Sequence, residues 1–204
     1  MRNLFLILAL AFLTACGTQS GNETINQGNG NETGQGDSSN LNTFVSGTLF
    51  DSLPVENTPY VDSIALEEFS PLRKVSLSTA QINFLKIRDI RAFRQYDWPM
   101  PDSAFSAVCR LKLSPEYYSV IINYDGQNET MNYLINYDRH YQVIDYLETA
   151  YDELVESMLR TSARIDTTAV TVRFADFLSS PQSVQEYTYT ISADGFFREM
   201  IAQQ

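Results

Sequence analysis

The chain has 204 residues, of which 44% are apolar and 12% aromatic, and this is enough for one ordinary folded domain. Its formal net charge of −11 argues against nucleic acid as a partner, because binding phosphates requires a basic surface. The two cysteines, Cys16 and Cys109, are too few for a disulfide framework and stand in very different contexts.

The N-terminus has the pattern of a secretory signal peptide. A short positive start, Met1–Asn3, precedes a continuous apolar run of ten residues, Leu4–Leu13. Such a run is too short to cross a bilayer core of about 30 Å, which needs about 20 residues. We therefore expect residues 1–15 to be a cleaved signal segment.

The apolar run ends in Leu13-Thr14-Ala15-Cys16, which resembles the lipobox of bacterial lipoproteins. The resemblance implies that Cys16 receives a diacylglyceryl group on its sulfur, that the chain is cleaved before it, and that the new amino terminus is acylated. Several acyl chains anchor a protein stably in a lipid membrane. The alternative is an ordinary secreted protein with a chance cysteine near the cleavage site.

The residues after Cys16 bear on which membrane holds the protein. Gly17-Thr18 follows, without the Asp that marks inner-membrane retention in enterobacteria and without an acidic cluster typical of surface export in the Bacteroidota. This favours the outer membrane, facing the periplasm, over the inner membrane or the cell surface.

Residues 16–42 are predicted to be a flexible tether. From Gly17 onward this segment consists mainly of Gly, Asn, Gln, Ser and Thr, and cannot bury enough apolar surface to offset the entropy of ordering. Its length of 26 residues after Cys16 gives a mean reach of about 25–30 Å.

Residues 43–204 are predicted to form a single antiparallel β-domain. Residues 44–50 are either a first strand or a segment that packs late, and residues 51–62, which contain Pro54 and Pro59, are expected to be a loop. The sequence from Ser78 to Gln81 is a capping-box pattern and predicts one short helix over residues 79–86.

The clearest structural pattern is the stretch Tyr117–Leu147, in which Ile-Asn-Tyr-Asp occurs twice. Alternation predicts strands over 117–124, 130–137 and 141–147, with tyrosines and aliphatic residues on one face and Asn123, Asn132 and Asn136 on the other. The turn at Asp125-Gly126 is attributed to the tolerance of Gly for positive φ. Two hairpins in series make a meander.

Further strands are predicted over 108–113 and 168–174, and a third hairpin joins 187–191 to 196–201. Residues 148–165 are left open between helix and strand: residues 151–159 have helical spacing, and residues 158–165 also have the pattern of a strand. About six to seven strands and one short helix give a mainly β fold, a sandwich or partial barrel. Residues 134–147 and 187–195 resemble small Bacteroidota lipoproteins of unknown function, and this resemblance implies a lineage but no activity.

The sequence offers little for catalysis. Cys109 lies on the apolar face of its predicted strand and is expected to be a buried, inert thiol, and His140, the single histidine, lies in a turn with no metal-ligand spacing around it. No phosphate-binding loop is present. We expect neither an enzyme nor a cofactor.

Aromatic residues suggest an alternative function, the binding of a glycan or small ligand. Tyr96 and Trp98, together with the tyrosines of the meander, are candidates for a surface that stacks on a glycan or small ligand. The competing interpretation is that these tyrosines pack the edge of the core with their hydroxyls in water. The favoured function is a non-enzymatic, lipid-anchored envelope module that binds a protein or other envelope component.

Overall fold

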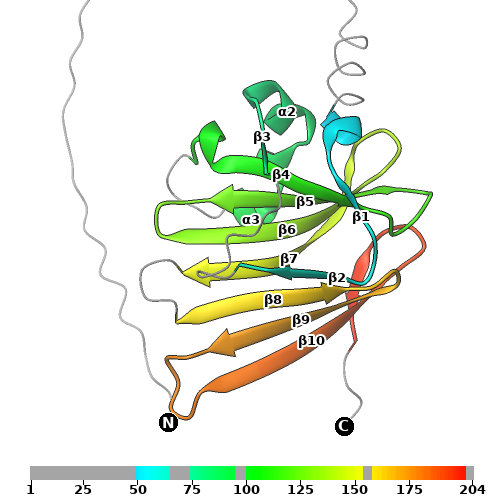
Figure 1. The fold of residues 1–204 in the computed structure, drawn as a ribbon. Coiled ribbons are helices and arrows are strands. Elements are labelled where there is room, and N and C mark those ends of the chain that lie inside the picture. The colour runs from blue at the N-terminus through cyan, green and yellow to red at the C-terminus, as the bar shows by residue number, and fades with distance from the viewer. Residues whose placement is uncertain (1–48, 65–73, 95–99, 154–157, 201–204) are drawn as a thin grey trace, which may run out of the picture. The chain divides into compact units, whose positions relative to one another are not determined.

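Strands dominate the described part of the chain, and all eleven of them belong to one sheet (Figure 1). The computed structural model describes residues 49–64, 74–94, 100–153 and 158–200. The predicted mainly β fold is confirmed.

The strands are β1 (Val55–Glu56), β2 (Tyr60–Ser63), β3 (Val75–Ser76), β4 (Phe105–Leu111), β5 (Tyr118–Asp125), β6 (Glu129–Tyr137), β7 (Val143–Glu153), β8 (Leu159–Ile165), β9 (Ala169–Asp176), β10 (Ser183–Ile191) and β11 (Phe197–Glu199). The helices are α2 (Thr79–Phe84) and α3 (Arg91–Arg94), with 3-10 turns η1 (Ile87–Asp89) and η2 (Asp102–Ala104). Residues 49–52 are also helical.

From β4 to β11 the sheet runs in chain order, and every neighbouring pair is antiparallel. β7 and β8 pair only at one end, where Tyr151 is opposite Thr161 and Asp152 is opposite Arg160. Beyond that point β2 takes the place of β7 and pairs with the rest of β8. β1 and β3 pair with β4.

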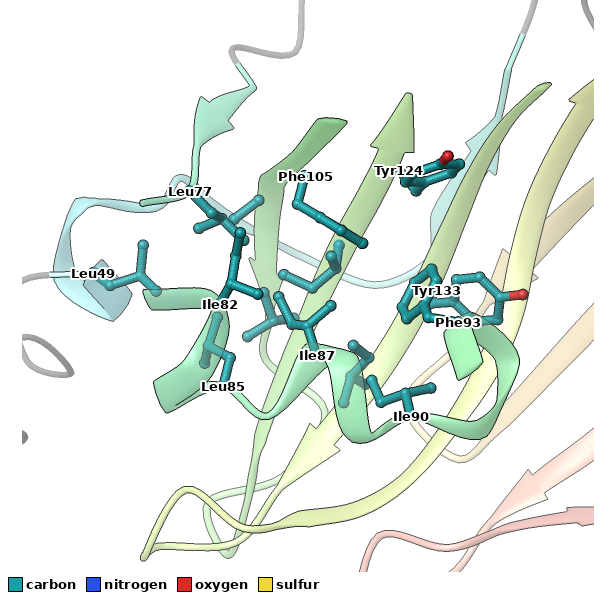
Figure 2. Packing of buried hydrophobic residues seen from close by; sticks show 14 of the residues in the cluster. Leu49, Leu77, Ile82, Leu85, Ile87, Ile90, Phe93, Phe105, Tyr124 and Tyr133 are labelled. Atoms are coloured by element: carbon teal, nitrogen blue, oxygen red, sulfur yellow. The ribbon is translucent and has the colours of Figure 1, made fainter. Parts of the chain in front are cut away.

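Two hydrophobic cores lie on opposite faces of β5 and β6, as their alternating side chains require. Ile122 and Ile135 belong to the first core, which the segment from Leu77 to Phe93 covers with its helices (Figure 2). Ile121 and Leu134 belong to the second core, whose other side comes from β2, β8, β9 and β10. The strands after β7 thus pack against the face of the meander that the helices leave free, as in a sandwich.

Strands β5 and β6, the start of helix α2 and the turn between β10 and β11 lie where the sequence predicted them, whereas β4 and β10 begin earlier, at Phe105 and Ser183. The capping box is formed: the Ser78 side chain accepts from the Gln81 backbone N–H, and the Gln81 side chain accepts from the Ser78 backbone N–H at 2.8 Å.

Other expectations were wrong. The predicted loop over residues 51–62 contains β1 and most of β2, and residues 49–50 are helical rather than extended. The alternatives left open over residues 148–165 are resolved as strand where the structure describes them: residues 148–153 belong to β7, and Leu159–Ile165 is β8. Short strands that depend on distant partners carry no alternation long enough to be recognised in sequence.

Candidate binding surface

Three residues that the sequence analysis singled out, Cys16, Tyr96 and Trp98, lie outside the described residues. The remaining candidates, Cys109, His140 and the tyrosines of the meander, all lie within the described residues.

Cys109 is fully buried in β4, as expected. Burial raises the pKa of its thiol to about 12, so the thiolate needed for nucleophilic chemistry is not populated near neutral pH. His140 lies exposed in the turn between β6 and β7, where its backbone N–H donates to Asp138 Oδ1 at 2.8 Å.

The tyrosines of the meander divide into two groups. Tyr124, Tyr133 and Tyr137 are buried in the first core. The Tyr137 hydroxyl donates to the Leu85 carbonyl at 3.1 Å and burial raises its pKa, so the expectation that these hydroxyls lie in water is wrong for Tyr137. This bond ties the end of α2 to β6.

A second group of aromatic residues stacks near the turn between β6 and β7. The rings of Tyr118 and Tyr141 are nearly parallel, at 6°, with their centroids 5.4 Å apart, and Phe50 contacts both. The guanidinium of Arg139 lies 4.7 Å from the centroid of the Tyr118 ring, which is a cation–π contact. The rings are in contact with one another, so this stack is a packing element.

A buried polar network lies between β2 and the meander. Asp62 of β2 accepts from Asn132 Nδ2 at 2.8 Å and from Thr149 Oγ1 at 2.6 Å. Thr149 is the extra residue of a bulge in β7, because Asn132 is opposite Ala150 while Tyr133 is opposite Glu148. The bulge lets Thr149 reach Asp62.

Burial raises the pKa of the Asp62 carboxyl, although the hydrogen bonds from Thr149 and Asn132 partly oppose that effect. The network continues through Asn123: its Nδ2 donates to Asn132 Oδ1 at 2.8 Å, and its Oδ1 accepts from the Ser106 hydroxyl at 3.3 Å. Each of these side chains is buried and bonded, which indicates a structural role for the network.

Glu148 lies on the opposite face of β7 from this network. Its carboxylate accepts from the Tyr133 hydroxyl at 3.1 Å and from the Thr161 hydroxyl at 3.3 Å, and burial raises its pKa. Within the described residues, no group of three or more His, Cys, Asp or Glu side chains could hold a metal ion. Asp62 and Glu148 are thus both hydrogen-bonded carboxylates.

The most unusual exposed surface is at the end of the sheet, on β10. Eight large apolar residues are exposed in the described ranges, and six of these lie within the last strands and their turns: Phe177, Leu178, Val184, Tyr187, Phe196 and Met200. Leu178 is 59% and Val184 50% exposed. Phe177, Leu178 and Val184 lie at or before the start of β10 and Phe196 follows its end, so exposed apolar residues occur along the length of this strand. Exposed apolar residues that gather in one region are typical of an interaction site.

The backbone of β10 is open over the same region. β11 pairs with β10 only at Tyr189, Thr190 and Ile191. Among the described residues no strand covers the outer side of Ser183–Thr188, apart from one bond in which Met200 N–H donates to the Thr188 carbonyl at 2.8 Å. We call Ser183–Thr188 the β10 edge; it carries one acid, Glu186, and none of the lysines or prolines that usually protect a sheet edge.

The sequence analysis missed the β10 edge because it placed the strand at Tyr187–Ile191. In a half-buried strand the apolar residues lie an even number of positions apart and share one face. Val184 and Tyr187 are three positions apart and point to opposite faces, so they do not fit that pattern. The signal that could have found them is the absence of Gly and Pro from Ser183 to Ile191.

Comparisons with known proteins add no relative: no protein-family model, curated protein or solved structure matches this chain. No helix in the described part of the chain is both long enough and apolar enough to cross a bilayer.

Proposed function

We propose that this chain is a lipid-anchored protein of the bacterial envelope whose β-domain binds a protein partner through the β10 edge. One observation carries the proposal: a strand edge that none of the described strands covers coincides with exposed apolar side chains, since Val184 and Tyr187 lie on β10 and Phe177 and Leu178 precede it. The lipobox motif at Cys16 supports the envelope location.

An open edge recognises a partner by adding a strand. The backbone groups of an extended segment from the partner pair with the edge, and flanking apolar side chains add buried area. Val184 and Tyr187 point to opposite faces of the sheet, so a partner that covers both must wrap the edge. A partner protein supplies an extended segment and an apolar surface together.

Photo-crosslinking in intact cells tests the proposal. A photoreactive amino acid at position 178 should capture a discrete protein, whereas the same probe at Val61, which is 64% exposed on β2, should not. Capture of the same products from both positions would contradict a specific surface.

A matched pair of variants distinguishes strand addition from non-specific apolar association. Met200 N–H bonds to the Thr188 carbonyl, so by alternation the backbone N–H of Glu186 also points outward from the edge. Glu186→Pro removes that backbone N–H donor. Glu186→Thr removes the charge but keeps the backbone N–H. The crosslink from position 178 should be lost in Glu186→Pro and kept in Glu186→Thr; equal capture by both variants would overturn strand addition.

A further inference from the structure

We propose that the outer face of β8, β9 and β10 rests on an anionic lipid surface and so orients the anchored domain. The outer face is the one turned away from the second core, and it carries Ser162, Arg164, Thr171, Arg173 and Thr188. The proposal takes from the proposed function only the lipid anchor, which keeps the domain near a bilayer. It does not depend on a partner at the β10 edge, whose backbone groups point along the plane of the sheet and not out of its face.

Alternation along neighbouring strands defines this face (Figure 1). Ala163 of β8 and Val172 of β9 belong to the second core. The residues next to them in the chain therefore point the other way. They stand in two opposite pairs, Ser162 with Arg173 and Arg164 with Thr171.

These four residues form a square of hydrogen-bond donors. Arg164 and Arg173 are exposed diagonal neighbours, with Cβ atoms about 7–8 Å apart. Arg173 forms no ion pair with any residue that the structure describes. Arg164 lies 3.2 Å from Asp166, but the two side chains are 57% and 46% exposed, so this pair is weak and can exchange its partner. Both guanidinium groups are thus available to the phosphates of lipid headgroups.

The charges on the outer face are opposite in sign to those of the whole chain. Arg160 of β8 and Arg198 of β11 lie on this face as well. Its carboxylates are Glu186, Asp166 and the buried Asp152, which lies 3.5 Å from Arg160. Four arginines against three carboxylates give the face a net charge of +1 in a chain of −11. An anionic surface therefore attracts this side of a chain that it otherwise repels.

Exposed apolar side chains stand on the same face. Val61 of β2 is 64% exposed and lies opposite Arg164. Met200 is 56% exposed and shares a face with Arg198, two positions before it. Apolar side chains that reach the acyl boundary, beside arginines that stay among the phosphates, are typical of a surface that lies on a bilayer.

The acidity of the rest of the chain is largely screened from such a bilayer. The acids of the meander lie beyond the second core, about 10 Å from the outer sheet layer. The Debye length at physiological ionic strength is about 8 Å. Because the anchor already holds the domain at the membrane, the face has only to select an orientation, and a tenfold preference requires about 1.4 kcal/mol.

Fluorescence quenching on the anchored protein in vesicles tests the orientation. The label is placed on Ser63→Cys, which is exposed on β2 opposite Ser162, since Cys16 is used by the anchor and Cys109 is buried. A quencher on the lipid headgroups should quench this label about threefold more in vesicles with phosphatidylglycerol than in phosphatidylcholine alone, because only the former attract the arginines. The matched label at Asn83→Cys, exposed on α2 beyond the first core, should be quenched equally in both.

Charge reversal identifies the residues responsible. Arg164→Glu combined with Arg173→Glu should lower the quenching at position 63 to its value in phosphatidylcholine. Arg91→Glu combined with Lys112→Glu makes the same change in net charge at exposed residues of α3 and after β4, and should leave the quenching within about twofold of the parent. Added salt should act as the first pair of substitutions does, without any variant.

Three results would overturn the proposal. Equal quenching at positions 63 and 83 in phosphatidylglycerol vesicles would contradict the orientation, and so would quenching at position 63 that survives the reversal of Arg164 and Arg173. Flotation of the vesicles is measured on the same samples. Protein that does not float with them would contradict the lipid anchor and with it this orientation, whereas protein that floats without preferential quenching at position 63 contradicts the orientation alone, so the two failures are distinguishable.

Discussion

Asp62 of β2 accepts a hydrogen bond from Asn132 of β6 at 2.8 Å, although the two residues are 70 positions apart in the chain. Asp62 is 3% and Asn132 6% exposed. This bond fixes β2 over the face of the meander that the helices do not cover. The polar face of β6 is therefore buried under β2, and the Asp62 carboxylate accepts a hydrogen bond from it.

Asp62→Ala should lower the free energy of unfolding by about 1–3 kcal/mol, because it leaves the buried amide of Asn132 without its acceptor. Thr149 is less affected, since its hydroxyl lies 3.3 Å from the Asn132 carbonyl and can donate there. Asp62→Asn keeps the shape and one acceptor oxygen and should cost less. Urea unfolding of the three proteins at pH 7 measures the difference; equal stability of parent and Asp62→Ala would contradict a structural role for the bond.

The same carboxylate predicts how stability depends on pH. Burial raises the pKa of Asp62 above its ordinary value of about 3.9. As pH rises from about 4, the unfolded chain therefore loses this proton first, which favours unfolding. The contribution of Asp62 is complete below the unfolded pKa, declines until pH passes the folded pKa, and is constant above it.

Asp62→Asn removes this titration, so the stability of the variant relative to the parent should improve as pH rises from 4 toward 7. Glu148→Gln should show the same sign, because burial also raises the pKa of Glu148. Urea unfolding at a series of pH values measures both. A difference between parent and Asp62→Asn that stays constant from pH 4 to 7 would rule out the proposed titration.

These polar residues also show how far the sequence could predict the fold. Alternation placed Asn123, Asn132 and Asn136 on the face opposite the tyrosines, and that assignment is confirmed. All three are nonetheless buried, because β8–β10 cover this face and β2 brings Asp62 to it. Alternation identifies which residues share a face, but only distant strands decide whether water reaches that face.

The turns show a similar limit. Gly126 was attributed to positive φ, yet Gly195 is the glycine with that conformation among the described residues, at φ +89°. Gly126 is needed for a close approach instead: a Cβ there would lie 2.7 Å from Tyr124 Cε1 and 3.0 Å from the Glu129 carbonyl oxygen. The position of the turn was predictable, but the reason for its glycine depends on a ring that packs over it.

Gly195→Ala should lower the free energy of unfolding by about 1–3 kcal/mol. The left-handed conformation is strained for any residue with a Cβ, and that Cβ would lie 3.2 Å from Ile144 Cδ1 and 3.3 Å from Tyr117 Cδ1. The Gly195 carbonyl also accepts from Asn136 Nδ2 at 2.7 Å, so the strain reaches β6. Thermal unfolding measures the effect. Asp194→Ala, in the same exposed turn, should stay within about 0.5 kcal/mol of the parent; equal effects of the two changes would contradict the conformational argument.

Tyr137→Phe should destabilise the protein by about 1–2 kcal/mol, since it leaves the buried Leu85 carbonyl without the hydroxyl that donates to it at 3.1 Å. The ring and its packing remain, so the cost reports the hydrogen bond between α2 and β6. Tyr118→Phe, on a half-buried ring, is the control and should cost less. Chemical denaturation of both variants makes the comparison, and a neutral Tyr137→Phe would show that the carbonyl finds another donor.

Under the proposed lipid anchor, Cys16→Ser should release the protein from membranes, because the serine oxygen cannot form the thioether through which the lipid would be attached. Cell fractionation measures the distribution, and mass spectrometry of the parent should show an acylated N-terminal cysteine. Cys109→Ser is the matched control: it also removes a thiol, but from the buried core, so its membrane fraction should equal that of the parent. If Cys16→Ser still partitions with membranes through an unchanged N-terminus, the lipid anchor is wrong, and an ordinary secreted protein becomes the better interpretation of Leu13-Thr14-Ala15-Cys16.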